Sequence, residues 1–396
     1  MGMVQLVIEV DKAREGRAKP QQDDHGAVSV LLEQLLEEAE RLDASHLHLA
    51  PGPAQADIAF RVGGLLHPYR QLASEQARML IEQVAREAGL VAESRAPQHG
   101  QMRWHGQAID VSLLPLLHGP RVVLRRPPMQ AGHRGLEALG IGSVLAQDIR
   151  AALAGTGLIL VASPVGNGRS TTLQALAAVA ASRTRPVLAI APEALPACPG
   201  MAMIASRDAA VAESIQAAID QDIDVLMIDS IGDRAVAAAA LAAAQAGRLV
   251  IAGIEAASAV AAIQQLRSWR IEAFQLASTM SLAIAQRLVR RLCGACREPV
   301  QASGSVSALL GFDPGTIVYA PAGCGACSET GYSGRTAVFE WVRGDAAIRR
   351  LINDGGDAAI LARHAFVTTP NLGSAARALA RTGVTTPEEA VRISRG

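Results

Sequence analysis

Nine residues, Ser-Pro-Val-Gly-Asn-Gly-Arg-Ser-Thr at 163–171, constrain the fold of this chain more than any other segment. They follow a short apolar run, 157–162, and lead into an Ala- and Leu-rich stretch, 171–181, that is typical of a helix. A strand, a glycine-containing loop and a helix in this order make a phosphate-binding loop, in which backbone N–H groups and a helix N-terminus hold phosphate. The sequence therefore predicts an α/β fold with this loop at the end of a strand.

The loop departs from the usual pattern at its charged position. Arg169 stands where phosphate-binding loops carry lysine, and Ser163 replaces the opening glycine. Lysine brings a compact ammonium group to the terminal phosphates, whereas arginine brings a broad, planar fork. The fork can pair with phosphate through two hydrogen bonds, but it also fills the space that a third phosphate needs. Weak binding of ATP and Mg²⁺, and a loop kept only as a strand-to-helix turn, are therefore both open interpretations.

Six residues of the loop are assigned to a nucleotide. Backbone N–H groups and the arginine would contact the β- and γ-phosphates, and one of two hydroxyls would hold Mg²⁺. The six are Gly166, Asn167, Gly168, Arg169, Ser170 and Thr171. Asp229 follows another apolar run, 225–228, where many phosphate-loop proteins keep a carboxylate on the metal side. We therefore treat Asp229 as a candidate Mg²⁺-side carboxylate.

Charge and hydropathy limit the function classes. The 396 residues include 37 basic and 37 acidic side chains, so the net charge is zero and no broad nucleic-acid-binding surface is expected. Only Lys12 and Lys19 are lysines, so drift in an Arg-biased chain is a second explanation of Arg169. The N-terminus lacks an apolar signal core, and the uncharged stretch 151–168 is interrupted by glycine and proline. We expect a cytoplasmic protein.

Four of the five cysteines form two matched pairs. Cys293 and Cys296 make one C-x-x-C pair, Cys324 and Cys327 make the other, and 27 residues separate the two. This spacing is typical of a closed, tetrahedral four-cysteine zinc site, which is structural because it leaves no coordination position open. The alternative is four unrelated thiols in a reducing compartment. We predict a structural zinc ion.

The pattern of elements predicts three parts. Residues 1–26 are polar and are interpreted as a mobile leader. Residues 27–128 combine a helix at 29–41 with alternating strands and are interpreted as a small α+β domain. In residues 129–396, apolar runs alternate with Ala-rich helices, which is the pattern of a mostly parallel sheet. Within that part, 290–335 is the zinc-binding segment and 301–316 is read as a Ser- and Gly-rich loop. Residues 385–393 are read as a short capped helix, with Thr386 and Glu389 placed as a capping box.

Several longer stretches, in order along the chain, carry a family resemblance. They are Ala-Ser-His-Leu-His-Leu at 44–49, Phe-Arg-Val-Gly-Gly-Leu-Leu at 60–66, Ala-Gln-Arg-Leu-Val-Arg-Arg-Leu-Cys at 285–293, Thr-Gly-Tyr-Ser-Gly-Arg at 330–335 and Gly-Val-Thr-Thr-Pro-Glu-Glu-Ala at 383–390. Together with the phosphate loop, they resemble the type II secretion and type IV pilus ATPase family, the general secretory pathway protein E group. The resemblance covers roughly residues 29–395.

The resemblance implies an architecture and partners. It implies a small N-terminal α+β domain that is PAS-like and a RecA-like P-loop ATPase core with a four-cysteine zinc-binding insertion and C-terminal helices. It also implies assembly as a homo- or hetero-hexamer on an inner-membrane platform protein, so that a cytoplasmic chain would become peripheral to the membrane through its partners. Nucleic acid is not among the expected partners.

Residues that work in this family are replaced here. The family glutamate that activates water corresponds to Ser230, and an arginine two residues later corresponds to Gly232. The histidine box, Thr-Leu-His-Thr in the family, reads Gly-Ile-Glu-Ala at 253–256, with Glu255 at the histidine position. The acidic box reads Ala-Pro-Glu-Ala-Leu at 191–195, with one acid left. In the N-terminal part an arginine becomes Asp110, whereas Arg125, also assigned to the nucleotide, is retained.

The replaced residues are those that serve catalysis in the family, whereas the residues that shape the fold are retained. Charge stabilisation and water activation each contribute orders of magnitude in rate, so their joint loss argues against turnover. The favoured hypothesis is a catalytically impaired, pseudo-ATPase subunit that assembles with an active secretion ATPase relative or with the platform. The alternative is a slow but genuine motor that uses Arg169 on phosphate and Asp229 on Mg²⁺. A RecA-type nucleic-acid motor is disfavoured by the neutral charge.

Overall fold

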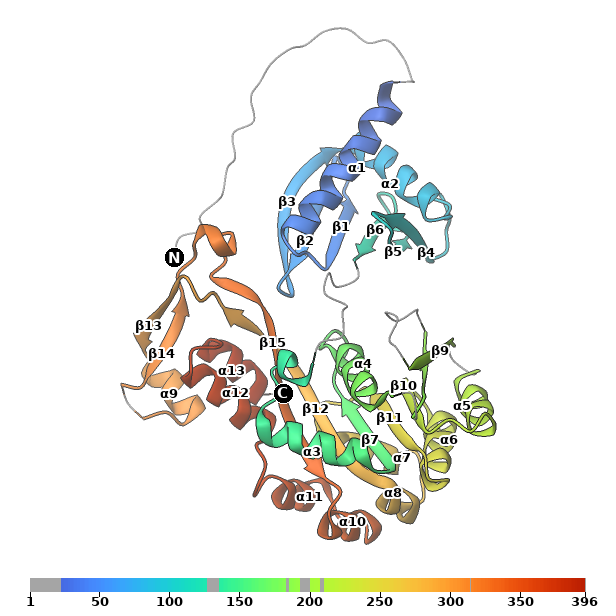
Figure 1. Ribbon diagram of the computed structural model, residues 1–396. Coiled ribbons are helices and arrows are strands. Elements are labelled where there is room, and N and C mark those ends of the chain that lie inside the picture. Colours follow the sequence, from blue (N-terminus) through green and yellow to red (C-terminus); the bar gives the residue numbers. More distant parts are fainter. Residues whose placement is uncertain are drawn as a thin grey trace. The chain divides into compact units, whose positions relative to one another are not determined.

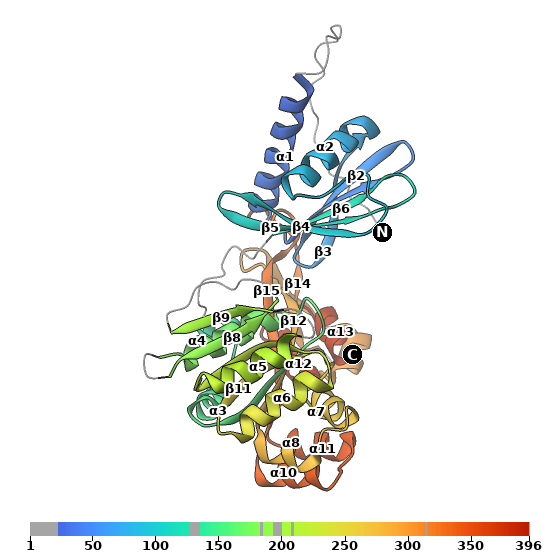
Figure 2. The same ribbon diagram turned by 90° about the vertical axis from the view of Figure 1, so that its right-hand side faces the viewer.

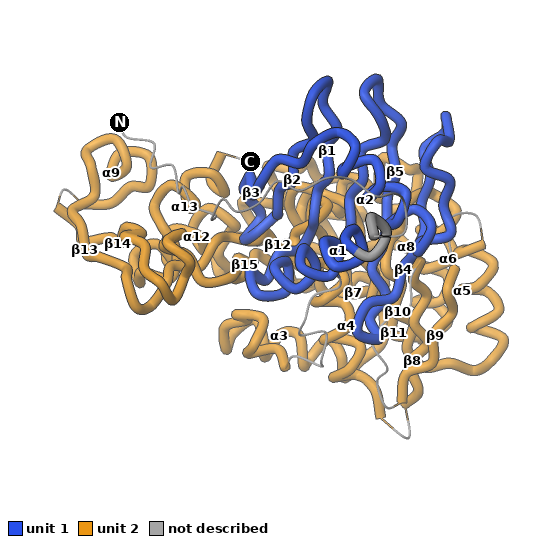
Figure 3. Tube along the Cα trace, turned by 90° about the horizontal axis from the view of Figure 1, so that it is seen from above, with its two compact units in different colours: residues 1–129 blue, residues 130–396 orange. Residues whose placement is uncertain are grey.

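The computed structural model describes residues 23–126, 135–182, 185–192, 200–206, 210–313 and 315–395, with side chains from residue 27 onward. Two compact units divide the chain, Met1–Met129 and Gln130–Gly396 (Figure 3). Each unit has its own hydrophobic core.

Unit 1 is a six-stranded antiparallel sheet with two helices on one face (Figure 2). The sheet order is β3-β2-β1-β6-β5-β4. Alternation explains the single covered face, because Leu47 and Leu49 are buried in the core of unit 1, while His48 between them points to the other face of the sheet. The elements are α1 (Asp23–Arg41), β1 (His46–Pro51), β2 (Gln55–Val62), β3 (Leu65–Ala73), α2 (Ser74–Glu87), β4 (Gln98–Trp104), β5 (Gln107–Leu114) and β6 (Arg121–Arg125).

The start of α1 corrects the sequence interpretation. The helix begins at Asp23, so residues 23–26, which we assigned to a leader, belong to its first turn. Residues 1–22, the rest of that assignment, lie outside the described residues. The first apolar residues of the periodic pattern lie about one turn inside the helix, and polar residues at a helix start give no apolar signal. The pattern therefore marked the buried face and missed the first turn.

Unit 2 is a seven-stranded sheet covered by helices on both faces (Figure 1). The order is β15-β12-β7-β11-β10-β8-β9, parallel throughout except for the antiparallel pair β12–β15. Along β7, Leu158 and Leu160 belong to one core while Ile159 and Val161 belong to the other. A strand buried on both faces reads as a continuous apolar run, which is the pattern seen at 157–162.

In unit 2, strands and helices largely alternate along the chain. They are η1 (Leu136–Leu139), α3 (Ser143–Ala154), β7 (Gly157–Ala162), α4 (Arg169–Ala180), β8 (Val187–Ala191), β9 (Met201–Ala205), α5 (Ala210–Asp220), β10 (Val225–Ile231), α6 (Arg234–Gln245), β11 (Leu249–Ile254), α7 (Ala259–Ser268), α8 (Ala273–Thr279), β12 (Met280–Leu292), β13 (Arg297–Gln301), α9 (Gly304–Leu310), β14 (Ile317–Pro321), η2 (Gly325–Cys327), β15 (Tyr332–Arg343), α10 (Ala346–Asn353), α11 (Ala358–Ala365), α12 (Leu372–Arg381) and α13 (Pro387–Ser394). Among the described helices, none is both long and apolar enough to cross a bilayer.

The segment 301–316, expected as a loop, contains the helix α9 instead. The Ser303 hydroxyl accepts a hydrogen bond from the Val306 N–H at 3.3 Å and so caps the helix start. Gly311 ends the helix in the left-handed region, with φ of 62°. Leu310 packs into a core formed with α12 and α13. The Ser and Gly residues that suggested a loop are thus the two ends of a short helix, which tertiary packing stabilises.

Candidate functional site

The phosphate-loop sequence lies between β7 and α4, where the parallel strand ends and the helix begins (Figure 1). Gly166 and Gly168 have φ of 77° and 81°, a backbone conformation that side-chain-bearing residues rarely adopt. The first N–H groups of α4 have no acceptor within the helix, so they are available to an anion. The backbone therefore has the geometry that an anion-binding loop requires.

Asn167 ties this loop to the neighbouring strand β12. Its Oδ1 accepts a hydrogen bond from the Leu288 N–H at 3.0 Å, and its backbone carbonyl accepts one from Gln286 Nε2 at 2.7 Å. Its Nδ2 donates to the carbonyl of Pro164 at 3.3 Å. Sequence reasoning assigned Asn167 to phosphate, and that assignment stays a prediction. The anchoring role came only with the structure, because Gln286 is far away in sequence.

Arg169 does not extend along the loop but packs against the end of β11. A side-chain Cβ at Gly253 would lie 2.9 Å from Arg169 Nε and 3.0 Å from its Cδ, so the glycine leaves the space that the arginine fills. The same Cβ would collide with the backbone carbonyl of Asp229, on β10. Arg169, Asp229 and Gly253 therefore meet where the parallel strands end, the usual ligand side of such a sheet.

Polar atoms at this meeting point are shielded from solvent and lack partners. Nε and Nη1 of Arg169 and Oδ1 of Asp229 make no hydrogen bond to any residue that the structure describes. Nor do these two side chains form an ion pair within 4.0 Å among the described contacts. Buried polar groups are nearly always paired with protein, water or a ligand. A polar ligand that reached these atoms would satisfy them.

The remaining acidic groups near β10 and β11 have other uses or are exposed. Asp233 caps α6, its Oδ1 accepting a hydrogen bond from the Val236 N–H at 2.9 Å. Ser230 lies within β10 beside Asp229, and Glu255 is exposed just after β11. Glu193, the one acid left in the acidic box, lies outside the described residues. Among the described residues, Asp229 is thus the acidic residue whose backbone lies beside Gly253 and the Arg169 side chain.

In unit 1, Arg125, which was expected to attract a phosphate, lies next to Asp110, which was expected to repel one. Arg125 on β6 and Asp110 on β5 are paired in register, and Nη1 of Arg125 lies 4.0 Å from Oδ2 of Asp110. Their side chains are 60% and 33% exposed, so the pair contributes little to stability. Its effect is on charge, because the carboxylate partly neutralises the retained arginine.

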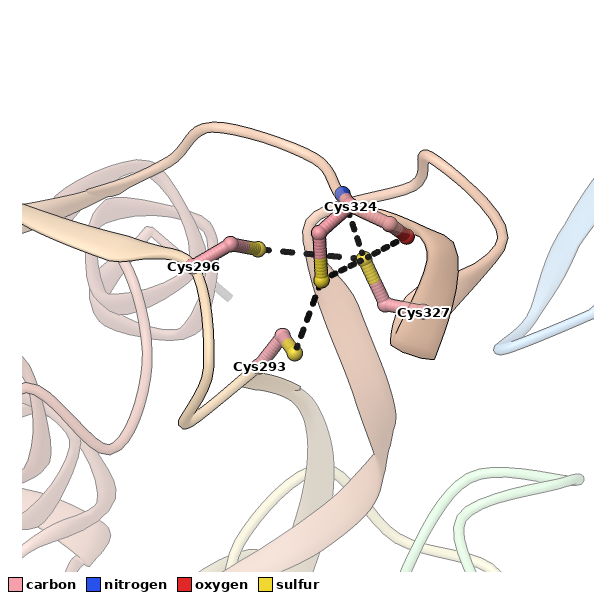
Figure 4. Close-up of side chains that lie close together, drawn as sticks. All are labelled: Cys293, Cys296, Cys324 and Cys327. Carbon is pink, nitrogen blue, oxygen red and sulfur yellow. Dashed lines mark hydrogen bonds between the residues drawn. The ribbon is translucent and has the colours of Figure 1, made fainter.

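The four cysteines come together at the end of the β12–β15 hairpin (Figure 4). All four sulfur atoms lie within 4.8 Å of one another. The Sγ···Sγ distance is 3.9 Å for Cys293–Cys324 and 3.8 Å for both Cys296–Cys327 and Cys324–Cys327. A tetrahedron with Zn–S bonds of about 2.3 Å has edges of about 3.8 Å. The cysteines are therefore placed to hold a metal ion, and their spacing fits zinc.

Backbone donors favour a thiolate in this cluster. Burial acts to raise the pKa of Cys327, but N–H groups of Cys324 and Gly331, at 3.3 and 3.1 Å from its sulfur, outweigh burial and lower the pKa to about 7. Burial raises the pKa of Cys296 to about 12 in the absence of a metal. Metal binding displaces the thiol protons, and the positive charge of the bound cation then stabilises the thiolates.

The family model of the type II/IV secretion system protein matches residues 21–392. Type II secretion system protein E of Pseudomonas aeruginosa is 35% identical over 408 residues, covering 100% of this chain and 81% of the relative. Type II secretion system ATPase E of Vibrio cholerae is 32% identical over 386 residues, covering 94% of this chain and 76% of the relative.

Solved structures agree on the fold. The ATPase DotB of Legionella pneumophila superposes with a TM-score of 0.67 at 17% identity, covering 93% of this chain and 96% of DotB. The pilus retraction motor PilT with bound ADP superposes with a TM-score of 0.63 at 18% identity, covering 92% and 96%. The fold is therefore the mixed α/β, RecA-like fold of secretion ATPases. On the family match and the identity to its relatives, the chain belongs to the type II/IV secretion system protein family.

Proposed function

We propose that this chain is a subunit of a type II secretion or type IV pilus machine that does not turn over ATP and acts in assembly or regulation. The observation that carries the proposal is the side chain of Arg169, which packs against Gly253 at the strand ends where terminal phosphate and Mg²⁺ would lie. Ser230 beside Asp229 is a poor base toward water. A site that holds the Arg169 guanidinium and has Ser230 in place of the family glutamate lacks a group that can activate water.

The proposed role uses surfaces instead of catalysis. RecA-like rings place nucleotide between neighbouring subunits, so an inert subunit still completes the site of an active neighbour. The proposed partners are an active secretion ATPase relative, in a homo- or hetero-hexamer, and the inner-membrane platform protein. Zinc, held by the four cysteines, would shape the surface of the C-terminal part and take no part in chemistry.

One observation favours a second function, a slow motor. Arg169 and Asp229 carry buried polar atoms without partners among the described residues, and these atoms suit phosphate and a metal respectively. In this alternative, Arg169 would bind the γ-phosphate and Asp229 would hold Mg²⁺. The two functions differ in turnover, which is directly measurable.

We expect ATP turnover by the purified chain to lie at least about 10²-fold below that of the Vibrio cholerae relative, because loss of one group that stabilises the transition state costs about 10²–10³ in rate. The measurement is phosphate release under identical conditions, with both proteins at equal concentration. Arg169→Ala is the companion variant. Turnover that equals the relative's and disappears in Arg169→Ala would replace the proposal with the motor function.

We expect the chain to co-purify from native cells with the platform protein or an active relative. Membrane recovery should occur with the platform gene present and fall to background when it is deleted. The measurement is affinity purification followed by mass spectrometry, with membrane and supernatant fractions analysed separately. A monomer in both strains with no family member recovered would contradict the assembly role.

A further inference from the structure

Glycine at position 253 leaves room for the Arg169 side chain. Any side chain there would meet Arg169 Nε at 2.9 Å and also collide with the Asp229 carbonyl, so only glycine fits. Gly253 belongs to the fully buried strand β11, where glycine is otherwise unfavourable. The backbone contact alone requires glycine here, and the Arg169 side chain occupies the space that this glycine leaves.

The Arg169 guanidinium changes which ligand the loop accepts. In a phosphate-binding loop, the backbone cradles the first phosphates, and the third phosphate and the metal lie beyond them. Arg169 begins α4 and folds onto the ends of β10 and β11, which is that farther side. The cradle, formed around Gly166 and Gly168, stays open to an anion. Two phosphates would then lie in this cradle, and the guanidinium would stand on the side where a third would lie.

The same guanidinium also replaces the metal. Mg²⁺ normally neutralises the oxygens of the bound phosphates and is held by a hydroxyl and a carboxylate. Here the Arg169 side chain lies beside Gly253 and the Asp229 backbone, and its positive charge would repel a divalent cation brought to this end of the sheet. The unpartnered Nε and Nη1 of Arg169 are donors for phosphate oxygens.

We infer that this loop binds a diphosphate group without Mg²⁺, with Arg169 as the counter-cation, and that it discriminates against triphosphate. The inference rests on the proposed function, since a subunit that does not hydrolyse ATP has use for a nucleotide only as a structural ligand. Free pyrophosphate and the diphosphate of a nucleotide such as ADP share this chemistry. Binding would order the loop that Asn167 connects to β12.

The test is isothermal titration calorimetry of the full chain with ADP, ATP and pyrophosphate, each in EDTA and in excess Mg²⁺. We expect ADP to bind in EDTA with a Kd within about threefold of that in Mg²⁺, because no metal completes the site. We expect ATP to bind at least about tenfold more weakly than ADP. If pyrophosphate binds as tightly as ADP, the diphosphate alone is the ligand. If pyrophosphate binds more weakly, the difference in binding free energy comes from contacts with the nucleoside.

Variants distinguish the arginine from the loop. Arg169→Ala should weaken ADP binding in EDTA by about tenfold or more, the effect of losing charge-assisted hydrogen bonds. Arg169→Lys should shift the preference toward ATP with Mg²⁺, because a compact ammonium leaves room for both. Arg349→Lys, on the exposed surface of α10, is the matched control and should change nothing. Circular dichroism confirms that each variant is folded.

Three results would overturn the inference: ADP binding that requires Mg²⁺, ATP binding as tight as ADP, or no binding of any of the three ligands. A fourth, Arg169→Ala with unchanged affinity, would assign binding to the backbone alone and remove Arg169 from the site. None of these results involves hydrolysis, so the inference can fail while the chain stays inert. Conversely, measured turnover would refute the proposed function whatever the Mg²⁺ dependence of ADP binding.

Discussion

Cys324→Ser is expected to release the metal and to lower the melting temperature of the chain by about 6–12 °C. The variant removes one of four sulfur atoms that lie within 4.8 Å of one another. Structural zinc sites contribute on the order of 10 kcal/mol in isolated peptides, so a loss of about 3 kcal/mol is a conservative share. In a unit of this size, each kcal/mol shifts the melting temperature by about 2–4 °C.

The local structure explains why this site should be sensitive. The cysteines join the long β12–β15 hairpin to the two-stranded sheet of β13 and β14. Every residue of β13 is exposed, and a two-stranded sheet is at best marginally stable by itself. A metal ion bound by the four cysteines would therefore stabilise the β13–β14 sheet, which packing alone stabilises poorly.

Elemental analysis and thermal unfolding check this prediction. Protein prepared without chelator should contain about one zinc ion per chain, and the variant well below that. Cys198→Ser is the matched control, because it removes the fifth cysteine, which lies outside the described residues. Zinc-free wild-type protein with an unchanged melting temperature would contradict the prediction.

Local sequence patterns foretold the parts of the site that depend on neighbours in sequence. The order of apolar run, glycine loop and Ala-rich stretch predicted the strand β7, the turn and the helix α4. The two C-x-x-C pairs predicted a common cluster, which the four sulfur atoms form. Both signals work because the spacing of the residues along the chain itself limits their geometry.

The contacts that position Arg169 and Asn167 of the phosphate loop join segments that are far apart in sequence. No local sequence pattern predicts such contacts. Arg169 fills the space beside Gly253, and Gln286 binds the carbonyl of Asn167. The sequence identified each of Arg169 and Gly253 as a departure from the family, but not that the two departures touch. Similarly, Asp110 was expected to oppose a phosphate, and the structure places it against Arg125.

The capped C-terminal helix illustrates a pattern that was partly right. Thr386 caps α13 as expected, its Oγ1 accepting a hydrogen bond from the Glu389 N–H at 3.4 Å. A capping box would send the Glu389 carboxylate back to the helix start. Instead it binds Arg290 on β12 and Arg392 within α13. Tertiary contacts to charged groups are stronger than the local alternative, so they decide the side-chain direction.

Glu389 is a buried anchor between α13 and β12. Its side chain is 7% exposed, and its oxygens accept hydrogen bonds at 3.1 Å from both the backbone N–H and Nε of Arg290 and at 2.8 Å from Arg392 Nη2. Arg290 also stacks over the ring of Tyr332, 4.1 Å from its centroid. Since Arg290 lies three residues before Cys293, the anchor fixes the strand that carries the first cysteine.

Burial alone would raise the pKa of Glu389. The hydrogen bond from Arg392 and the one from the Arg290 N–H outweigh burial, so the pKa lies below its ordinary value. A carboxyl group with a lowered folded-state pKa stabilises the fold at pH values above its unfolded pKa, about 4.3. That stabilisation is lost as the pH falls from there through the folded-state pKa.

Glu389→Gln is accordingly expected to cost about 2 kcal/mol at pH 7, the range for hydrogen bonds to a charged group, and to lower the melting temperature by about 4–8 °C. Glu388→Gln, at the exposed neighbouring position, removes the same charge and should leave the melting temperature nearly unchanged. The difference between the two variants in melting temperature should be full at pH 7. It should shrink as the pH falls from about 4.3, where the carboxyl group of the unfolded chain takes up a proton, through the lower pKa of the folded state. A difference that stays constant to pH 3 would show that packing, and not the charge of Glu389, anchors α13.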